Sequence, residues 1–156
     1  MLGWFKSLMS PQPAGQPRVI RRFGMGDRTI TVDGVIAESD LWRIESGTER
    51  TVHLFEMPVS GLERCILTYR AQIRTVDSVG RVYLEMWCRV PGRDEYSSRG
   101  LQHAVTGGSE WAACETPCFL KAGERPDLVK LNVVCAGTVL IKGRRSRRAS
   151  TSPRAR

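Results

Sequence analysis

Alternation of apolar and polar side chains is the feature that most constrains the fold of this sequence. It is clearest in residues 82–90, VYLEMWCRV, where apolar residues occupy every second position and Tyr83, Glu85, Trp87 and Arg89 lie between them. Successive side chains of a β-strand point to opposite faces of its sheet, so the pattern predicts a strand with one face in a core. A helix would repeat every 3.6 residues, and no window keeps such a period at length.

Two further stretches, 65–74 and 129–135, alternate in the same way. Their core faces are predicted to hold Cys65, Leu67, Tyr69, Ala71 and Ile73 in the first, and Val129, Leu131, Val133 and Cys135 in the second. If the three strands lie in one sheet, their polar positions come together on its outer face.

The rest of the chain consists of short apolar runs separated by turn signals. The 15 glycines and 8 prolines cluster between these runs, and Asp33-Gly34 and Ser46-Gly47 are typical of tight turns. Further strands are expected at 18–24, 28–32, 34–39, 41–46, 51–57, 111–120 and 138–142, with a long connection at 91–110. Eight or so short strands in 156 residues predict a single all-β domain, a β-sandwich of two antiparallel sheets.

The net charge of +8 is concentrated at the C-terminal end. Residues 142–156 hold seven Lys or Arg and no acid, which leaves 17 basic and 16 acidic residues before them. We therefore expect three regions: an N-terminal arm and Pro/Gly linker (1–17), the sandwich (18–142), and a disordered basic tail (143–156). Residues 1–9 are interpreted either as a frayed terminus or as a short docking or membrane-surface helix.

The five cysteines are odd in number and lie within apolar runs, without a signal-peptide pattern before them. Free buried thiols in a cytoplasmic protein are the simplest interpretation, and no segment reaches the roughly 20 apolar residues of a membrane span.

The outer face of the predicted sheet is the candidate binding surface. An outward Trp87 among amide, carboxylate and guanidinium groups suits sugar rings and other planar or polyhydroxy ligands. The alternative is an ordinary solvated face on which Arg stems cover the indole. The candidate ligand-binding residues are Arg70, Gln72, Glu85, Trp87, Arg89, Lys130 and Asn132, with Tyr96 and Arg99 at the edge.

Trp111, TPCFLKAGERP (116–126), VKLNVV (129–134) and AGTVLI (136–141) follow one another near the end of the chain. In this order they resemble the closing segments of jelly-roll domains of the galactose-binding-like, carbohydrate-binding-module type, over roughly residues 28–142. The resemblance implies a jelly-roll fold and, for many members, carbohydrate binding. Where that family often has Trp and then acidic residues, this chain has Leu140 and Lys142-Gly143, so no calcium or other metal is predicted.

Residues for catalysis are scarce. Only His53 and His103 are available as bases, and Cys114 and Cys118 lack a second ligand pair at metal-finger spacing. The sequence therefore predicts a non-catalytic binding module without a cofactor. Its alternative is a protein-interaction scaffold whose basic tail contacts nucleic acid or an anionic surface, and RRAS (147–150) resembles a kinase site directed by basic residues. The ligand and the oligomeric state stay open.

Overall fold

The computed structural model describes residues 17–143, so the predicted N-terminal arm and basic tail lie outside the described residues except at their boundaries. These residues form seven strands and one short 3-10 helix, η1 (Leu101–His103). All strand pairs are antiparallel, which confirms the all-β prediction. The strands are β1 (Val35–Ala37), β2 (Leu41–Pro58), β3 (Cys65–Asp77), β4 (Tyr83–Arg89), β5 (Tyr96–Arg99), β6 (Ala112–Leu120) and β7 (Leu128–Lys142).

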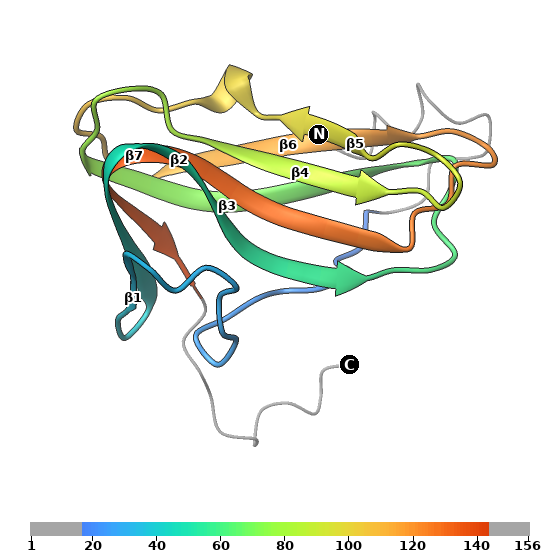
Figure 1. The fold of residues 1–156 in the computed structure, drawn as a ribbon, viewed down its shortest axis with the longest axis horizontal. Helices are drawn as coiled ribbons and strands as arrows, with labels where there is room; N and C mark the ends of the chain where they lie inside the picture. The colour runs from blue at the N-terminus through green and yellow to red at the C-terminus, as the bar shows by residue number, and fades with distance from the viewer. Residues whose placement is uncertain (1–16, 144–156) are drawn as a thin grey trace.

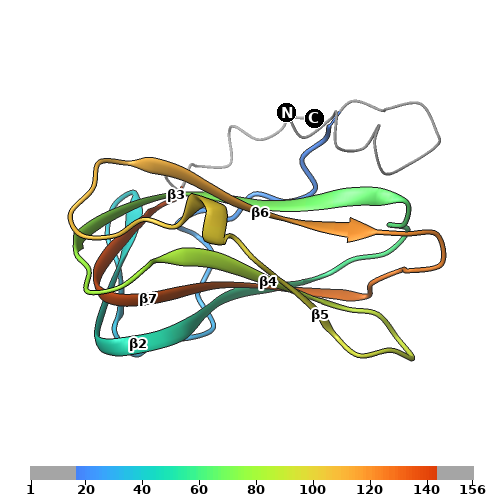
Figure 2. The same ribbon diagram turned by 90° about the horizontal axis from the view of Figure 1, so that it is seen from above.

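All seven strands belong to one hydrogen-bonded sheet, and not to the two separate sheets that were predicted; this sheet bends into two layers (Figures 1 and 2). The β4 layer consists of β5, β4, the first half of β7 and the second half of β2. The β3 layer consists of β6, β3, the second half of β7, the first half of β2, and β1. β2 and β7 pair along almost their whole length and therefore belong to both layers.

Both long strands bend at the same place. The pairing of β2 with β7 shifts between Ser46 and Arg50, opposite Gly137 and Cys135. Gly137 has φ +89°, and a Cβ at this position would lie 1.8 Å from the carbonyl oxygen of Asp77. Only glycine permits this backbone conformation and this close approach, so Gly137 allows β7 to leave β4 and pair with the end of β3.

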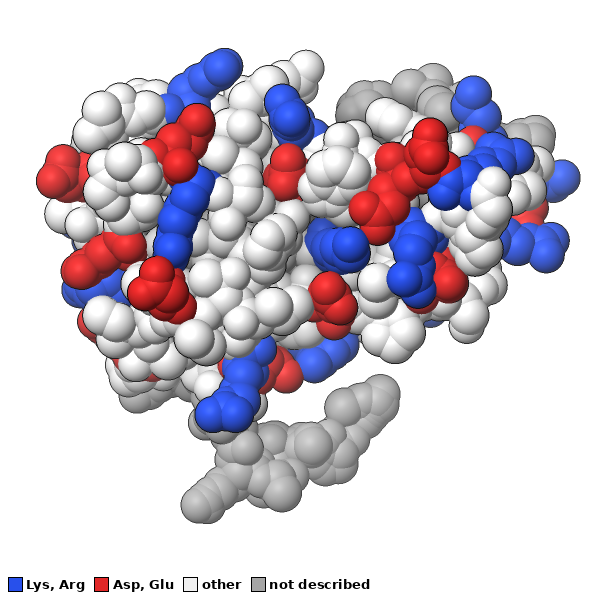
Figure 3. Space-filling model, viewed as in Figure 1, with Lys and Arg blue, Asp and Glu red and all other residues white. Residues whose placement is uncertain are grey.

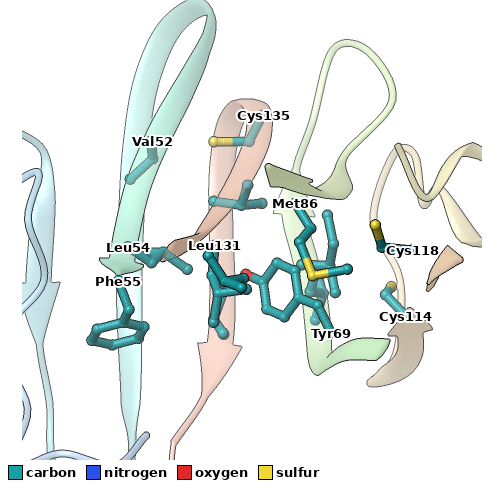
Figure 4. Packing of buried hydrophobic residues seen from close by; sticks show 14 of the residues in the cluster. Val52, Leu54, Phe55, Tyr69, Met86, Cys114, Cys118, Leu131 and Cys135 are labelled. Carbon is teal, nitrogen blue, oxygen red and sulfur yellow. The ribbon is translucent and has the colours of Figure 1, made fainter. Parts of the chain in front are cut away.

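The core fills the space between the layers. The alternation predicted for 82–90 is confirmed, because Val82, Leu84 and Cys88 have no exposed surface. Figure 4 shows how side chains from both layers meet, with Met86 and Leu131 of one layer close to Tyr69 of the other. None of the five cysteines is in a disulfide in the described part of the chain; four are buried and Cys65 is partly buried.

Several predicted boundaries were wrong. The runs 41–46 and 51–57 are one strand, β2, and the runs 128–136 and 138–142 are one strand, β7, because the glycines between them bend a strand without ending it. Residues 18–24 and 28–32 form no extended strand, and 28–32 is instead held to β2 by backbone bonds from Ile30 to Leu54 (2.9 Å) and from Thr31 to His53 (2.8 Å). The connection 91–110 contains β5 and η1.

No helix within residues 17–143 is long and apolar enough to cross a membrane.

Candidate ligand-binding face

A shallow hollow of about 390 Å³ lies on the outer face of the β4 layer. We call it the Trp87 basin; it is lined by Thr51, His53, Glu85, Trp87, Glu95, Lys130 and Asn132. These residues come from β2, β4, β7 and the loop before β5. The outward positions of adjacent strands thus form a continuous surface, as alternation predicts for one face of a sheet.

Strand register places the lining residues in rows across the sheet. Glu85 of β4 lies opposite Asn132 of β7 and opposite Arg99 of β5, and Asn132 in turn lies opposite His53 of β2. Directly opposed side chains in antiparallel strands are close enough to interact. The next row pairs Trp87 with Lys130.

The first row forms a chain of polar contacts across four strands. Asn132 Nδ2 donates to Glu85 Oε1 at 3.1 Å, and Asn132 Oδ1 lies 3.1 Å from His53 Nδ1. The other carboxylate oxygen of Glu85 lies 3.7 Å from Nε of Arg99. Glu85 and Asn132 are 6% and 1% exposed, so these contacts satisfy groups that would be costly to bury alone.

This bonding pattern assigns a role to each ring nitrogen of His53. Because the Asn132 amide nitrogen donates to Glu85, its oxygen is left to accept a hydrogen bond, and His53 Nδ1 is then the donor. In the neutral ring, Nε2 keeps a lone pair for a ligand. His53 is itself exposed.

The second row supplies an aromatic surface and a charged pair. Trp87 is half-buried and lies on the outer face of its strand, not between the layers. Beside it, Lys130 Nζ lies 3.0 Å from Glu95 Oε2, and both side chains remain about one third exposed. The basin therefore combines an indole with donors and acceptors, the composition of many small-molecule sites.

Charge does not single out this face. In the view of Figure 3, Lys and Arg side chains are intermixed with Asp and Glu, without a large area of one sign. Recognition here would depend on hydrogen bonds and stacking more than on net charge.

Arg70 and Gln72 are not part of the Trp87 basin. The prediction assumed that the three strands lie in one sheet, and they do, but the sheet bends so that β3 and its neighbour β6 lie in the other layer. There Arg70 Nε lies 3.1 Å from Glu115 Oε1. β3 and β4 meet the same edge of β7 at different halves, and the bend at Gly137 separates them.

The remaining predicted residues lie at or beyond the rim. Arg99 reaches the basin through Glu85, whereas Arg89 is paired with Asp127 at 2.9 Å. Tyr96 lies opposite Cys88, on the inward side of β5, and its hydroxyl donates to Glu124 Oε2 at 2.7 Å. Tyr96 is therefore partly buried against the core and does not face the basin.

Sequence reasoning missed Thr51, His53 and Glu95. The alternation of Thr51 and His53 with Val52 and Leu54 was a usable signal, because it places the first two on one face of a strand. The order of strands in the sheet, which brings β2 beside β7, was not readable from one sequence. Glu95 lies in a loop and had no periodic signal.

Three of the buried thiols have raised pKa values and are poor nucleophiles at neutral pH, whereas a hydrogen bond with Cys88 lowers the pKa of Cys118. Burial raises the pKa of Cys114 and of Cys135 to about 11. A hydrogen bond with Cys118, together with burial, raises the pKa of Cys88 above its ordinary value. Within residues 17–143, no three His, Cys, Asp or Glu side chains are grouped so that they could hold a metal ion.

No model of a known protein family matches the chain, and a search of curated proteins finds no significant match.

Proposed function

We propose that the protein is a non-catalytic binding module that recognises a carbohydrate or another polyhydroxy ligand at the Trp87 basin. The observation that carries this proposal is the adjacency of a half-buried outward indole to the polar row His53, Asn132, Glu85. The apolar face of a sugar ring stacks on an indole, and its hydroxyl groups need both donors and acceptors close to that plane.

The proposed contacts follow from the geometry of the basin. Stacking on Trp87 would place ring hydroxyls near Glu95 and Lys130, which are already paired and partly exposed. His53 Nε2, on the far side of the basin, would accept a hydrogen bond from a ligand hydroxyl. Glu85 and Asn132 are buried and mutually bonded, so we assign them the role of holding the surface in shape.

We further propose that the fold is a jelly roll of the galactose-binding-like type. This is supported by the position of the segments that resemble that family. TPCFLKAGERP covers the end of β6 and the turn after it, and VKLNVV and AGTVLI lie in the two halves of β7 at the centre of the sheet.

A glycan array with the intact protein, followed by calorimetry on each glycan that binds, tests the function. We expect Trp87→Ala to weaken binding at least tenfold, about 1.4 kcal/mol. Trp111→Ala is the matched control, because Trp111 is also partly buried but lies outside the basin lining. Its ring makes a cation–π contact with Lys142 instead. The control should bind as the natural protein does.

The proposal fails if no glycan or polyol binds the intact protein, or if Trp87→Ala and Trp111→Ala weaken binding equally. Thermal melting of both variants must accompany the measurement. A large loss of stability in Trp87→Ala alone would make Trp87 a residue of the fold and not of recognition.

A second candidate function rests on the charge distribution along the chain. Seven Lys or Arg and no acid in residues 142–156 favour contact with nucleic acid or an anionic surface. Because β7 ends at Lys142, truncation after Gly143 removes six of these charges and leaves the strand intact. Salt-sensitive binding to DNA or RNA that survives truncation would exclude this role for the tail.

A further inference from the structure

A second cavity, unrelated to the Trp87 basin, opens between the two layers. It measures about 930 Å³, within the range of small-molecule pockets. On one side of β3, Cys65–Ile73 pair with β6, but on the other side pairing with β7 begins only at Ile73. The two layers therefore leave an opening along the first half of β3, which we call the β3 cleft.

The segment 17–23 forms the outer wall of the β3 cleft. It has no strand structure before Phe23, whose ring stacks on Phe55 with centroids 4.2 Å apart. Figure 1 shows this blue segment running past the region between β2 and β3. Residues 17–23 have no strand pairing, although Gly24 directly after them is in a β-bridge, so this wall can move more easily than either layer.

The deep side of the cleft is apolar. It is lined by core residues from both layers and from the bent strands: Trp42, Leu54, Phe55, Met86, Val129, Leu131 and Ile141. These surfaces would favour a ligand with an apolar body.

Two lining residues of the cleft, Thr68 and Tyr69, carry a buried hydroxyl without a hydrogen-bond partner among the described residues, and the Tyr69 hydroxyl is the one in the interlayer space. Tyr69 is 8% exposed, and among the described residues its Oη has no hydrogen-bond partner and no access to water. Figure 4 shows its ring crossing the interlayer space toward Leu131. Burial of this phenol raises its pKa well above the ordinary value. A buried hydroxyl without a hydrogen bond lowers the stability of the fold, and a ligand atom that accepts a hydrogen bond from it would remove that cost.

The rim of the cleft is cationic. Arg18, Arg21, Arg22, Arg64, Arg70 and Lys142 line it, with Glu63 as the one acidic lining residue among those described. Glu63 is bonded to Arg125, which lies outside the lining. Three of these arginines form no ion pair within residues 17–143: Arg18, Arg22 and Arg64. The side chain of Arg64 is exposed, and its backbone has φ +55°.

We propose that the β3 cleft binds a free amphipathic organic anion of the fatty-acid class, with its apolar chain between the layers and its carboxylate at the Arg18, Arg22 and Arg64 rim. Charge complementarity selects this occupant. Residues 1–17 hold apolar side chains but no acid, so this segment of the chain cannot neutralise the rim. The proposal is independent of the sugar-binding function of the Trp87 basin.

Displacement of a fluorescent probe tests the proposal on the full-length protein. The probe is 1-anilinonaphthalene-8-sulfonate, an apolar ring system with one N–H and one anionic group. We expect dodecanoate to displace it at concentrations below micelle formation. Dodecyltrimethylammonium has a similar chain and the opposite charge, and it should compete at least tenfold more weakly.

Matched charge reversals locate the site. Arg64→Glu should weaken dodecanoate binding at least tenfold, since it removes one rim cation and adds an anion. Arg81→Glu makes the same change at an exposed arginine that lines neither the β3 cleft nor the Trp87 basin, and it should leave binding within twofold. Thermal melting of each variant excludes probe binding to a loosened fold.

A third variant tests the deep end of the cleft. Tyr69→Phe removes the unpaired hydroxyl, so it should raise the melting temperature of the free protein. It should also weaken competition by 12-hydroxydodecanoate more than competition by dodecanoate, because only the former can reach Tyr69 with a polar atom.

Four results would overturn the proposal. The first is equal competition by the anion and the cation, and the second is equal effects of Arg64→Glu and Arg81→Glu. The third is displacement of the probe by a synthetic peptide of residues 1–16 as effectively as by dodecanoate. The fourth is binding to phosphatidylglycerol vesicles without binding to monomeric dodecanoate. The third would assign the cleft to the N-terminal segment, and the fourth to a membrane surface.

Discussion

Replacing Gly137 by alanine tests whether the bend of β7 holds the two layers together. Two costs add at this position. A side chain at φ +89° costs about 1–2 kcal/mol. The new Cβ would also lie 1.8 Å from the Asp77 carbonyl oxygen, so β3 and β7 must separate by more than 1 Å, and overpacking of this kind costs about 1–3 kcal/mol.

We therefore expect Gly137→Ala to lower the free energy of unfolding by about 2–5 kcal/mol, a large part of the roughly 5–15 kcal/mol of a domain. At about 4 °C per kcal/mol, the melting temperature should fall by about 8–20 °C. Urea unfolding of the full-length protein, followed by circular dichroism, measures the free energy directly.

Gly92 provides a control that isolates the steric contact. Its φ is +82°, but nothing lies within 4 Å of an added Cβ. Gly92→Ala should therefore show the conformational cost alone, about 1–2 kcal/mol. If the two variants lose the same stability, the close approach of β7 to Asp77 has no energetic consequence and the explanation given for Gly137 is wrong.

Two other predictions concern buried polar groups. Asn132→Ala should lower the free energy of unfolding in urea by about 2–4 kcal/mol, because it leaves the buried Glu85 carboxylate without its amide donor. The double variant with Leu at both 85 and 132 should recover most of that loss. An equal loss in the double variant would show that the pair is not coupled. Stability should fall as pH rises from about 9 to 11, because unfolded thiols ionise near 9.0 while folded Cys114 and Cys135 keep their protons to about 11. At pH 10 the two thiols together should lower the free energy of unfolding by roughly 2–3 kcal/mol relative to neutral pH. The Cys114→Ala and Cys135→Ala double variant should show a flatter dependence of this free energy on pH between about 9 and 11.

The sequence allowed the faces of the strands to be predicted, since alternation is a local property. The apolar set of 82–90 is buried as expected, and so is the whole predicted core face of 129–135. The same alternation placed Glu85 and Asn132 on the outer face, which is correct for strand geometry. Their burial was not foreseen, because their contacts with each other, with Arg99 and with His53 depend on which strands are neighbours in the sheet.

Strand neighbours, in contrast, are set by the whole chain. Arg70 was grouped with Trp87 because both lie on outward positions of long strands, yet β3 pairs with β6 and faces the other way. Tyr96 was placed at the rim, but the register of β5 turns its ring toward the core. Gly137 was interpreted as a break between strands, although its left-handed backbone bends one continuous strand.

The two long strands that run through both layers also decide how a guest molecule gets in. Because β2 and β7 are each part of both layers, the layers cannot separate without breaking the pairing or the chain direction of these two strands. A ligand of the β3 cleft would therefore enter along β3 and displace segment 17–23. Its association rate would then depend on how often the stack of Phe23 on Phe55 opens.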